Sequence, residues 1–172
     1  MRHQLLHDLG ACANAVLWAE TFSSLQLAWD ACERGNWMLW LLGKLAGPVG
    51  SDSRRKLVLV ATECARLAWP HVRERDRKVV LKCYETCEAY GRGDSAVTLE
   101  MVRDASYAAN ANASYAAYAA AYAAYAAYAA NAVDAAYAAN AVDAARSKTL
   151  RDCADIVRKH YPVVPTVKEA VK

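Results

Sequence analysis

The spacing of apolar positions predicts a chain of amphipathic helices up to about residue 161. Leu, Val and Trp recur three or four residues apart, the interval that places side chains on one face of a helix. Gly10 would kink or split the first of these helices. The predicted helices before residue 94 cover His3–Phe22, Ser24–Glu33, Trp37–Leu42, a segment from Ser51–Ser53 to Trp69, and Asp76–Tyr90.

Capping and breaking residues separate these helices. Ser23 and Gln26 form a capping-box pattern before the second helix, and Gly35 is expected to close that helix. Asn36 is expected to cap the Trp37–Leu42 segment, which is apolar on all sides and therefore belongs inside the protein. Pro70 is expected to end one helix and to stand in the first turn of the next. Further breaks are predicted at Gly43, Gly47, Pro48, Gly50, Gly91 and Gly93.

The stretch from Asp94 to Tyr161 contains neither Gly nor Pro. As one helix it would be about 100 Å long, whereas a compact domain of this size is only about 40 Å across. The stretch must therefore bend back or protrude. Thr98 is expected to cap its start, breaks are expected at 110–114 and 146–149, and Pro162 is expected to stop the last helix.

Residues 105–145 form an internal repeat with 24 alanines and seven tyrosines. The unit Asn-Ala-Val-Asp-Ala-Ala occurs twice, nine residues apart, and several tyrosines share one helical face. Two interpretations of the tyrosines remain open. Their rings could fill space between helices, or they could form a surface for a ligand or partner.

The composition fits one helical domain over residues 1–162, with a tail at 163–172. The chain is 56% hydrophobic, but its mean hydropathy is only −0.04 because so many of these residues are alanine. The Ala/Tyr tract lacks the Leu, Ile and Phe of a membrane span, and the N-terminus has no apolar leader. We therefore expect a protein that stays in the cytoplasm and keeps its six cysteines as free thiols.

The charge distribution argues against duplex nucleic acid as a partner. The net charge is +3, and basic blocks at 51–92 and 146–172 flank an acidic block at 93–145. Oppositely charged helices that pack together explain this alternation without any ligand, and a strong nucleic-acid binder would concentrate far more positive charge.

The sequence contains no motif of a known catalytic or cofactor site. There is no dinucleotide or phosphate loop, no nucleophile elbow and no zinc-protease motif. The pairs His3/His7 and Cys83/Cys87 lack the further ligands of a metal site. We therefore expect a protein that is not an enzyme and has neither a cofactor nor a metal.

Aromatic and basic residues point to binding instead. Trp29, Trp37, Trp40 and Trp69 are expected to be mainly core anchors, and the arginines of residues 53–82 are most simply a solvated rim. The same groups could hold a nucleotide, because aromatic rings stack on a base and guanidinium groups pair with phosphate. The candidate ligand-binding residues are Arg54, Arg55, Arg66, Trp69, Tyr118 and Tyr122.

Several sequence blocks resemble the immunity-five-like family of immunity proteins found in bacteria and phages. The resemblance covers roughly residues 12–162, and Asn36 stands where the family commonly has an acidic residue. The blocks are Ala28–Cys32, Gly35–Leu41, Arg54–Leu57, Cys64–Arg66, Glu85–Tyr90, the Ala/Tyr tract and Cys153–Arg158.

The resemblance implies an all-helical protein with a role in biological conflict, encoded by a bacterium or a phage, and it supplies no catalytic residues. The first hypothesis is a non-catalytic protein that binds and inhibits a protein toxin or effector. The alternative is a sponge that sequesters a small nucleotide-derived immune signal, of cyclic nucleotide or cyclic ADP-ribose type. A weaker alternative is an enzyme that degrades such a signal. Because Ala-rich faces favour close helix pairing, we expect an all-α helical bundle with a long Ala/Tyr helix or helix pair that forms a homo-oligomer.

Overall fold

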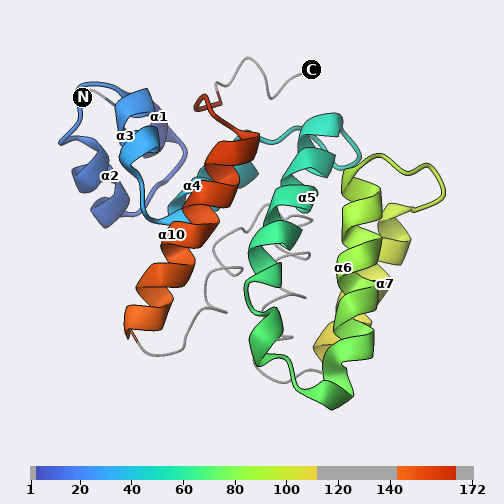
Figure 1. Cartoon of the computed structure of the whole chain (residues 1–172). Coiled ribbons are helices and arrows are strands. Elements are labelled where there is room, and N and C mark those ends of the chain that lie inside the picture. The colour runs from blue at the N-terminus through green and yellow to red at the C-terminus, as the bar shows by residue number, and fades with distance from the viewer. Residues whose placement is uncertain (1–2, 112–142, 166–172) are drawn as a thin grey trace.

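The computed structural model describes residues 3–111 and 143–165, and all regular structure within these ranges is helical (Figure 1). It contains eight α-helices, two short 3₁₀ helices and no strand in the part of the chain described. The all-α prediction is therefore confirmed. The elements are α1 (Gln4–Asp8), α2 (Ala13–Ala19), α3 (Leu25–Ala31), α4 (Gly35–Leu45), α5 (Asp52–Arg66), η1 (Trp69–His71), η2 (Glu74–Asp76), α6 (Arg77–Gly91), α7 (Leu99–Ala111) and α10 (Asp143–His160).

The longer helices pack around one shared hydrophobic core. Helices α5, α6 and α7 pack against one another in chain order, and α10 returns from the far end of the sequence to lie against α4 and α5 (Figure 1). The short helices α1 to α3 gather at one end of this assembly. Fully buried residues of four different helices meet in the core: Met38, Leu57, Val58, Val80, Cys87 and Val157.

The N-terminal helices begin and end at other residues than the sequence suggested. Gly10, with φ of +76°, splits the first predicted helix into α1 and α2, because this left-handed conformation suits a residue without a Cβ atom. The cap of α3 is Ser24 rather than Ser23, since the Ser24 Oγ accepts a hydrogen bond from the Leu27 N–H at 3.1 Å. Asn36 lies inside the first turn of α4, and Arg34 takes the capping position expected for Asn36.

Gly35 does not close α3 but begins α4. A Cβ atom at this position would meet the Cβ atom of Cys153 on α10 and lie 2.8 Å from the backbone nitrogen of Ala154. Glycine is therefore needed here for the close approach of two helices, not for a turn.

The break predicted at Gly43 is wrong, because α4 continues through it to Leu45, where the buried Leu42 and Leu45 pack on the core. Several other predicted boundaries are confirmed. Ser51 caps α5, with its Oγ accepting from the Arg54 N–H at 3.3 Å, and the Thr98 Oγ1 accepts from the Met101 N–H at the same distance at the start of α7. Pro70 separates α5 from α6 and lies in η1. α10 ends at His160, two residues before Pro162.

The predicted break at 146–149 is wrong, because α10 runs through it from Asp143 to His160. Lys148 and Asp152, one helical turn apart, form an ion pair at 2.6 Å. Leu150, Ala154 and Val157 continue as one buried stripe, so packing against the core favours an unbroken helix. Of the other expected break, at 110–114, residues 110 and 111 still belong to α7, and 112–114 lie outside the described residues, as does most of the Ala/Tyr tract.

None of the helices in the described ranges is both long enough and apolar enough to span a membrane.

Candidate functional site

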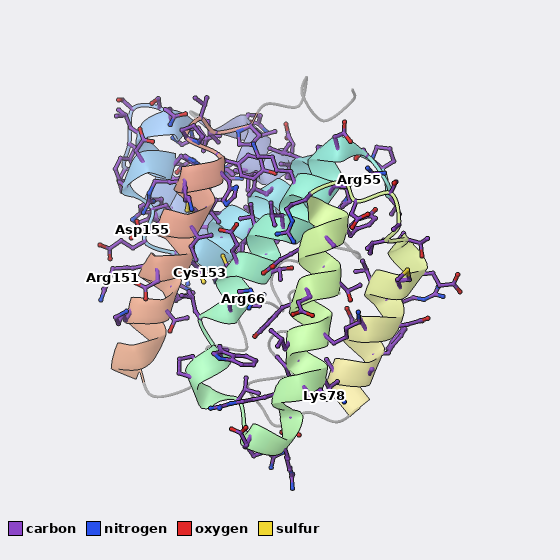
Figure 2. The ribbon with its side chains drawn as sticks, turned by 45° about the vertical axis from the view of Figure 1, so that its right-hand side comes forward. Arg55, Arg66, Lys78, Arg151, Cys153 and Asp155 are labelled. Atoms are coloured by element: carbon purple, nitrogen blue, oxygen red, sulfur yellow. The ribbon has the colours of Figure 1, made fainter. Side chains whose placement is uncertain are left out.

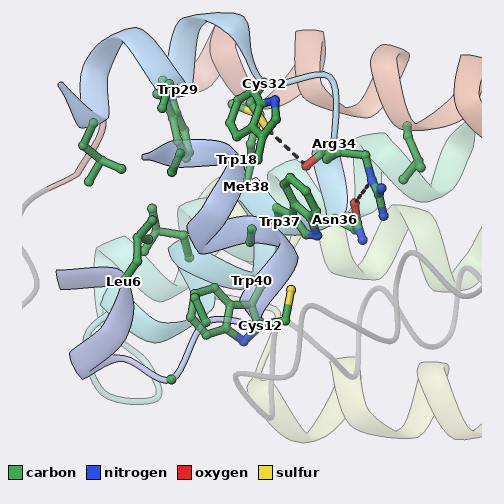
Figure 3. Close-up of a pocket in the computed structure, with 18 residues that line it drawn as sticks. Leu6, Cys12, Trp18, Trp29, Cys32, Arg34, Asn36, Trp37, Met38 and Trp40 are labelled. Atoms are coloured by element: carbon green, nitrogen blue, oxygen red, sulfur yellow. Dashed lines mark hydrogen bonds between the residues drawn. The ribbon is translucent and has the colours of Figure 1, made fainter. Parts of the chain in front are cut away.

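The described part of the protein contains a pocket of about 380 Å³ among its N-terminal helices. Its lining residues come from α1, α2, α3 and α4 and the connections between them, together with Leu150 of α10 (Figure 3). Four of the five tryptophans of the chain line it: Trp18, Trp29, Trp37 and Trp40. We call this hollow the tryptophan pocket.

Three helices position these indole rings. Trp18 extends from α2, Trp29 from α3, and Trp37 and Trp40 lie three residues apart on α4, which places them on the same side of that helix. The Trp18 and Trp37 ring centroids are 5.8 Å apart with the planes tilted by 55°. This is a favourable geometry for an aromatic pair.

The four indoles differ in burial. Trp29 is only 4% exposed, and its Nε1–H donates a hydrogen bond to the Tyr161 carbonyl at 2.9 Å, so the core-anchor interpretation holds for this residue. Trp18, Trp37 and Trp40 are half-buried. All three line the pocket, so their rings can contact a ligand bound there.

Arg34, in the connection between α3 and α4, is the single charged side chain among the described residues that line the pocket. Its guanidinium carbon lies 4.6 Å from the Trp37 ring centroid, and its Nε donates a hydrogen bond to the Asn36 Oδ1 at 3.3 Å (Figure 3). The stacking and the hydrogen bond together orient the guanidinium beside an aromatic wall.

Two cysteines also line the pocket. The Cys32 thiol is buried and donates to the Arg34 carbonyl at 3.6 Å, and burial raises the pKa of this thiol above its usual value. Cys32 is therefore a neutral thiol at physiological pH. Cys12 is exposed and lies near Trp40 in the view of Figure 3.

Of the ligand-binding residues predicted from the sequence, those that the structure describes lie outside the tryptophan pocket. They do not form one site. Arg54 is buried; its Nε donates to the Gly47 carbonyl at 3.2 Å and its Nη2 to the Ala46 carbonyl at 3.3 Å. Burial lowers the pKa of its guanidinium. Arg54 therefore fastens the connection between α4 and α5 from inside.

Arg66 and Trp69 do come together, around Tyr84 of α6. The Arg66 guanidinium carbon lies 4.8 Å from the Tyr84 ring centroid, and the Trp69 and Tyr84 centroids are 6.1 Å apart. Arg66 also forms an ion pair with Glu88, and this hydrogen-bonded contact raises the pKa of Arg66 above its usual value. The charge that was expected to meet a phosphate is thus already matched by a carboxylate.

Arg55 lies near the other end of α5 from Arg66 (Figure 2). Its guanidinium carbon is 5.6 Å from the Tyr90 ring centroid, and its Nε is buried without a hydrogen-bond partner among the described residues. Tyr118 and Tyr122 lie outside the described residues. None of the described residues of the predicted set lines the tryptophan pocket.

The sequence does carry a signal for this pocket. Four tryptophans fall between residues 18 and 40, with Arg34 and Asn36 among them, but no helical face unites them because they belong to three different helices. Only the packing of α2, α3 and α4 brings them together. Comparison of the chain with protein family models, with curated proteins and with solved structures finds no match.

Proposed function

We propose that this protein binds and sequesters a small aromatic ligand in the tryptophan pocket. The observation that carries the proposal is the pocket itself, a hollow of about 380 Å³ whose lining includes four tryptophans and Arg34. This volume falls in the range of small-molecule sites, which are mostly apolar with a few placed polar groups. Indole rings stack on flat ligands, nucleobases included.

The lining supports binding rather than turnover. Its described residues include no carboxylate and no histidine, the groups most often used for proton transfer. The Cys32 thiol is protonated, so it is a weak nucleophile. The ligand class that fits both this pocket and the expected role in biological conflict is a nucleotide-derived immune signal. A sponge protein would remove such a signal from solution.

The test is to incubate the purified full chain with cyclic nucleotides, ADP-ribose-type nucleotides and simple aromatic acids. Binding is followed by calorimetry and by the fluorescence of the pocket tryptophans, and the protein is then heated to release the ligand. Intact recovered ligand supports sequestration, whereas an altered product supports the enzyme alternative. Trp40→Leu should abolish binding, and Trp69→Leu, outside the pocket, is the matched control.

A protein toxin or effector is the second candidate partner. Exposed Leu17 on α2 and Leu27 on α3 support it, with 64% and 50% of their surface accessible. A stable complex would bury roughly 1,200 Å² or more. If a protein partner binds this surface, the parent chain should capture it and the double variant Leu17→Ser/Leu27→Ser should not. Trp40→Leu should still capture the same protein.

We further propose a homo-oligomer built on the Ala/Tyr tract, working in the cytoplasm of a bacterial cell. The alanine-rich sequence supports close pairing of helices between copies. Light scattering that gives a monomer at high micromolar concentration would contradict the oligomer.

A further inference from the structure

The described lining of the tryptophan pocket carries a single formal charge. Among the described residues that line it, Arg34 contributes the one formal charge and Asn36 the one amide, while the others are apolar, aromatic or thiol side chains. The Lys44 amine lies 5.8 Å from the Trp40 ring centroid, but Lys44 is not among the lining residues. The pocket thus presents one positive charge against a largely apolar wall.

The Arg34 guanidinium has N–H donors that are not used by the described residues. One face of it covers Trp37 and its Nε is used by Asn36, but its two terminal nitrogens make no hydrogen bond or ion pair with any residue in 3–111 or 143–165. The neighbouring carboxylate of Glu33 is exposed and pairs with Arg151 at 3.8 Å instead. A guanidinium edge of this kind can bind a carboxylate or a phosphodiester by donating two parallel N–H···O bonds.

From these contacts we infer that the ligand is a flat aromatic molecule with a single negative charge, whose ring lies on the indoles and whose anionic group meets Arg34. The inference rests on the proposed function, because it describes the ligand of the same pocket. A phosphate monoester or a polyphosphate would bring a second negative charge against apolar side chains, and a buried charge without a partner is strongly disfavoured. A cyclic nucleoside monophosphate and an aromatic carboxylate share the required chemistry.

The experiment compares probes that share one aromatic ring system and carry different charges, using the full chain and calorimetry. The nucleotide series is adenosine, 3′,5′-cyclic AMP, AMP and ATP, and the second series is indole and indole-3-acetate. We expect the singly charged member of at least one series to bind about tenfold or more tightly than its neutral counterpart, as one charge-assisted contact provides. AMP and ATP should bind more weakly than cyclic AMP, and the series that responds identifies the source of the ligand.

Two variants assign the effect to Arg34. Arg34→Gln should remove the preference for the singly charged probe and leave the neutral probe unchanged, whereas Arg75→Gln, at a largely exposed arginine of η2, should preserve the preference. Equal binding of neutral and charged probes, or tightest binding of ATP, would overturn the inference while leaving small-ligand binding intact. If no probe binds, the proposed function fails, and the inference fails with it.

Discussion

Arg158 of α10 donates a hydrogen bond from its Nη1 to the backbone carbonyl of Cys32 at 2.6 Å. The same nitrogen lies 3.4 Å from the Trp29 carbonyl, and the Nη2 pairs with Asp155 at 2.6 Å. One arginine near the end of the chain thus holds the connection between α3 and α4. Because that connection carries Cys32 and Arg34, Arg158 helps to fix the polar edge of the tryptophan pocket without lining it.

Replacing Arg158 with Met should lower the free energy of unfolding by about 2 kcal/mol, the usual contribution of hydrogen bonds from a charged donor to partly buried acceptors. Urea denaturation measures the change. Arg151→Met is the matched control on the same helix, since Arg151 makes one exposed ion pair at 3.8 Å and should change stability by only about 0.5 kcal/mol. Equal losses in the two variants would show that the contacts of Arg158 to the α3–α4 connection add nothing.

Helix boundaries were predictable from the sequence where they depend only on neighbouring residues. Ser51 and Thr98 cap their helices as expected, because a hydroxyl next to an orphan N–H needs no tertiary partner. Predictions of helix boundaries were wrong where contacts between helices determine the backbone conformation. Gly35 looks like a helix terminator but begins α4, since only glycine allows α10 to approach there, and 146–149 looks like a break but stays helical under the buried stripe of α10.

Two buried tyrosines of α6 should respond differently to loss of the hydroxyl. The Tyr84 hydroxyl donates to the Ala65 carbonyl at 3.0 Å, whereas the Tyr90 hydroxyl is buried without a hydrogen-bond partner in the described residues. Tyr84→Phe should therefore cost about 1 kcal/mol, and Tyr90→Phe should be neutral or slightly stabilising. Thermal or urea denaturation at pH 7 compares them, and a larger loss for Tyr90→Phe would reverse the assignment.

Tyr84 should also make the protein sensitive to alkali. Burial raises its pKa above the ordinary value of about 10, so the folded state favours the neutral phenol. Its contribution to stability is complete below that ordinary pKa and is lost as the pH rises above about 10, because the unfolded chain gives up the proton more readily. Tyr84→Phe should consequently lose less stability than the parent between about pH 9.5 and 11.

Tyr161 and the buried thiols of Cys64 and Cys87 have pKa values raised in the same direction. They remain in both proteins, so the difference between parent and Tyr84→Phe isolates Tyr84. Parallel stability curves over this pH range would show that Tyr84 ionises equally well in both states.

Cys12 offers a test of the pocket that needs no assumption about ligand charge. It is the one exposed cysteine among the six and it lines the pocket, whereas the others are buried or half-buried. A thiol reagent should therefore modify Cys12 first, and a bound ligand should slow this reaction about tenfold. Mass spectrometry locates the modified residue, and Cys12→Ser removes the fast phase. Modification at an unchanged rate with saturating ligand would place the ligand elsewhere.

The candidate site was harder to predict than the fold. Arg54 and Arg66 were predicted as ligand-binding residues because arginines are dense near a tryptophan in the sequence. In the structure both bind other groups of the protein: Arg54 donates a hydrogen bond to the Gly47 carbonyl, and Arg66 forms an ion pair with Glu88. Trp29, Trp37, Trp40 and Trp69 were expected to be core anchors, but only Trp29 is buried, and the other three are half-buried. Partial exposure of an indole is set by tertiary packing and cannot be read from spacing along one helix.

Filling the pocket should separate binding from folding. Ala15 of α2 lines the tryptophan pocket and is half-buried, and Ala13 lies on the same helix but is exposed and outside the lining. In Ala15→Phe the new ring occupies space that the ligand needs, so binding of any pocket ligand should fall about tenfold or more. Its stability should stay within about 1 kcal/mol of the parent, because the added apolar surface fills an existing hollow.

Ala13→Phe adds the same side chain two residues away, so it controls for the loss of an alanine from α2. It should bind like the parent. Calorimetry measures affinity and urea denaturation measures stability in all three proteins. If Ala15→Phe binds as tightly as Ala13→Phe while both remain folded, the ligand lies outside the hollow between α1 and α4, and the tryptophans that line it serve only to pack the N-terminal helices together.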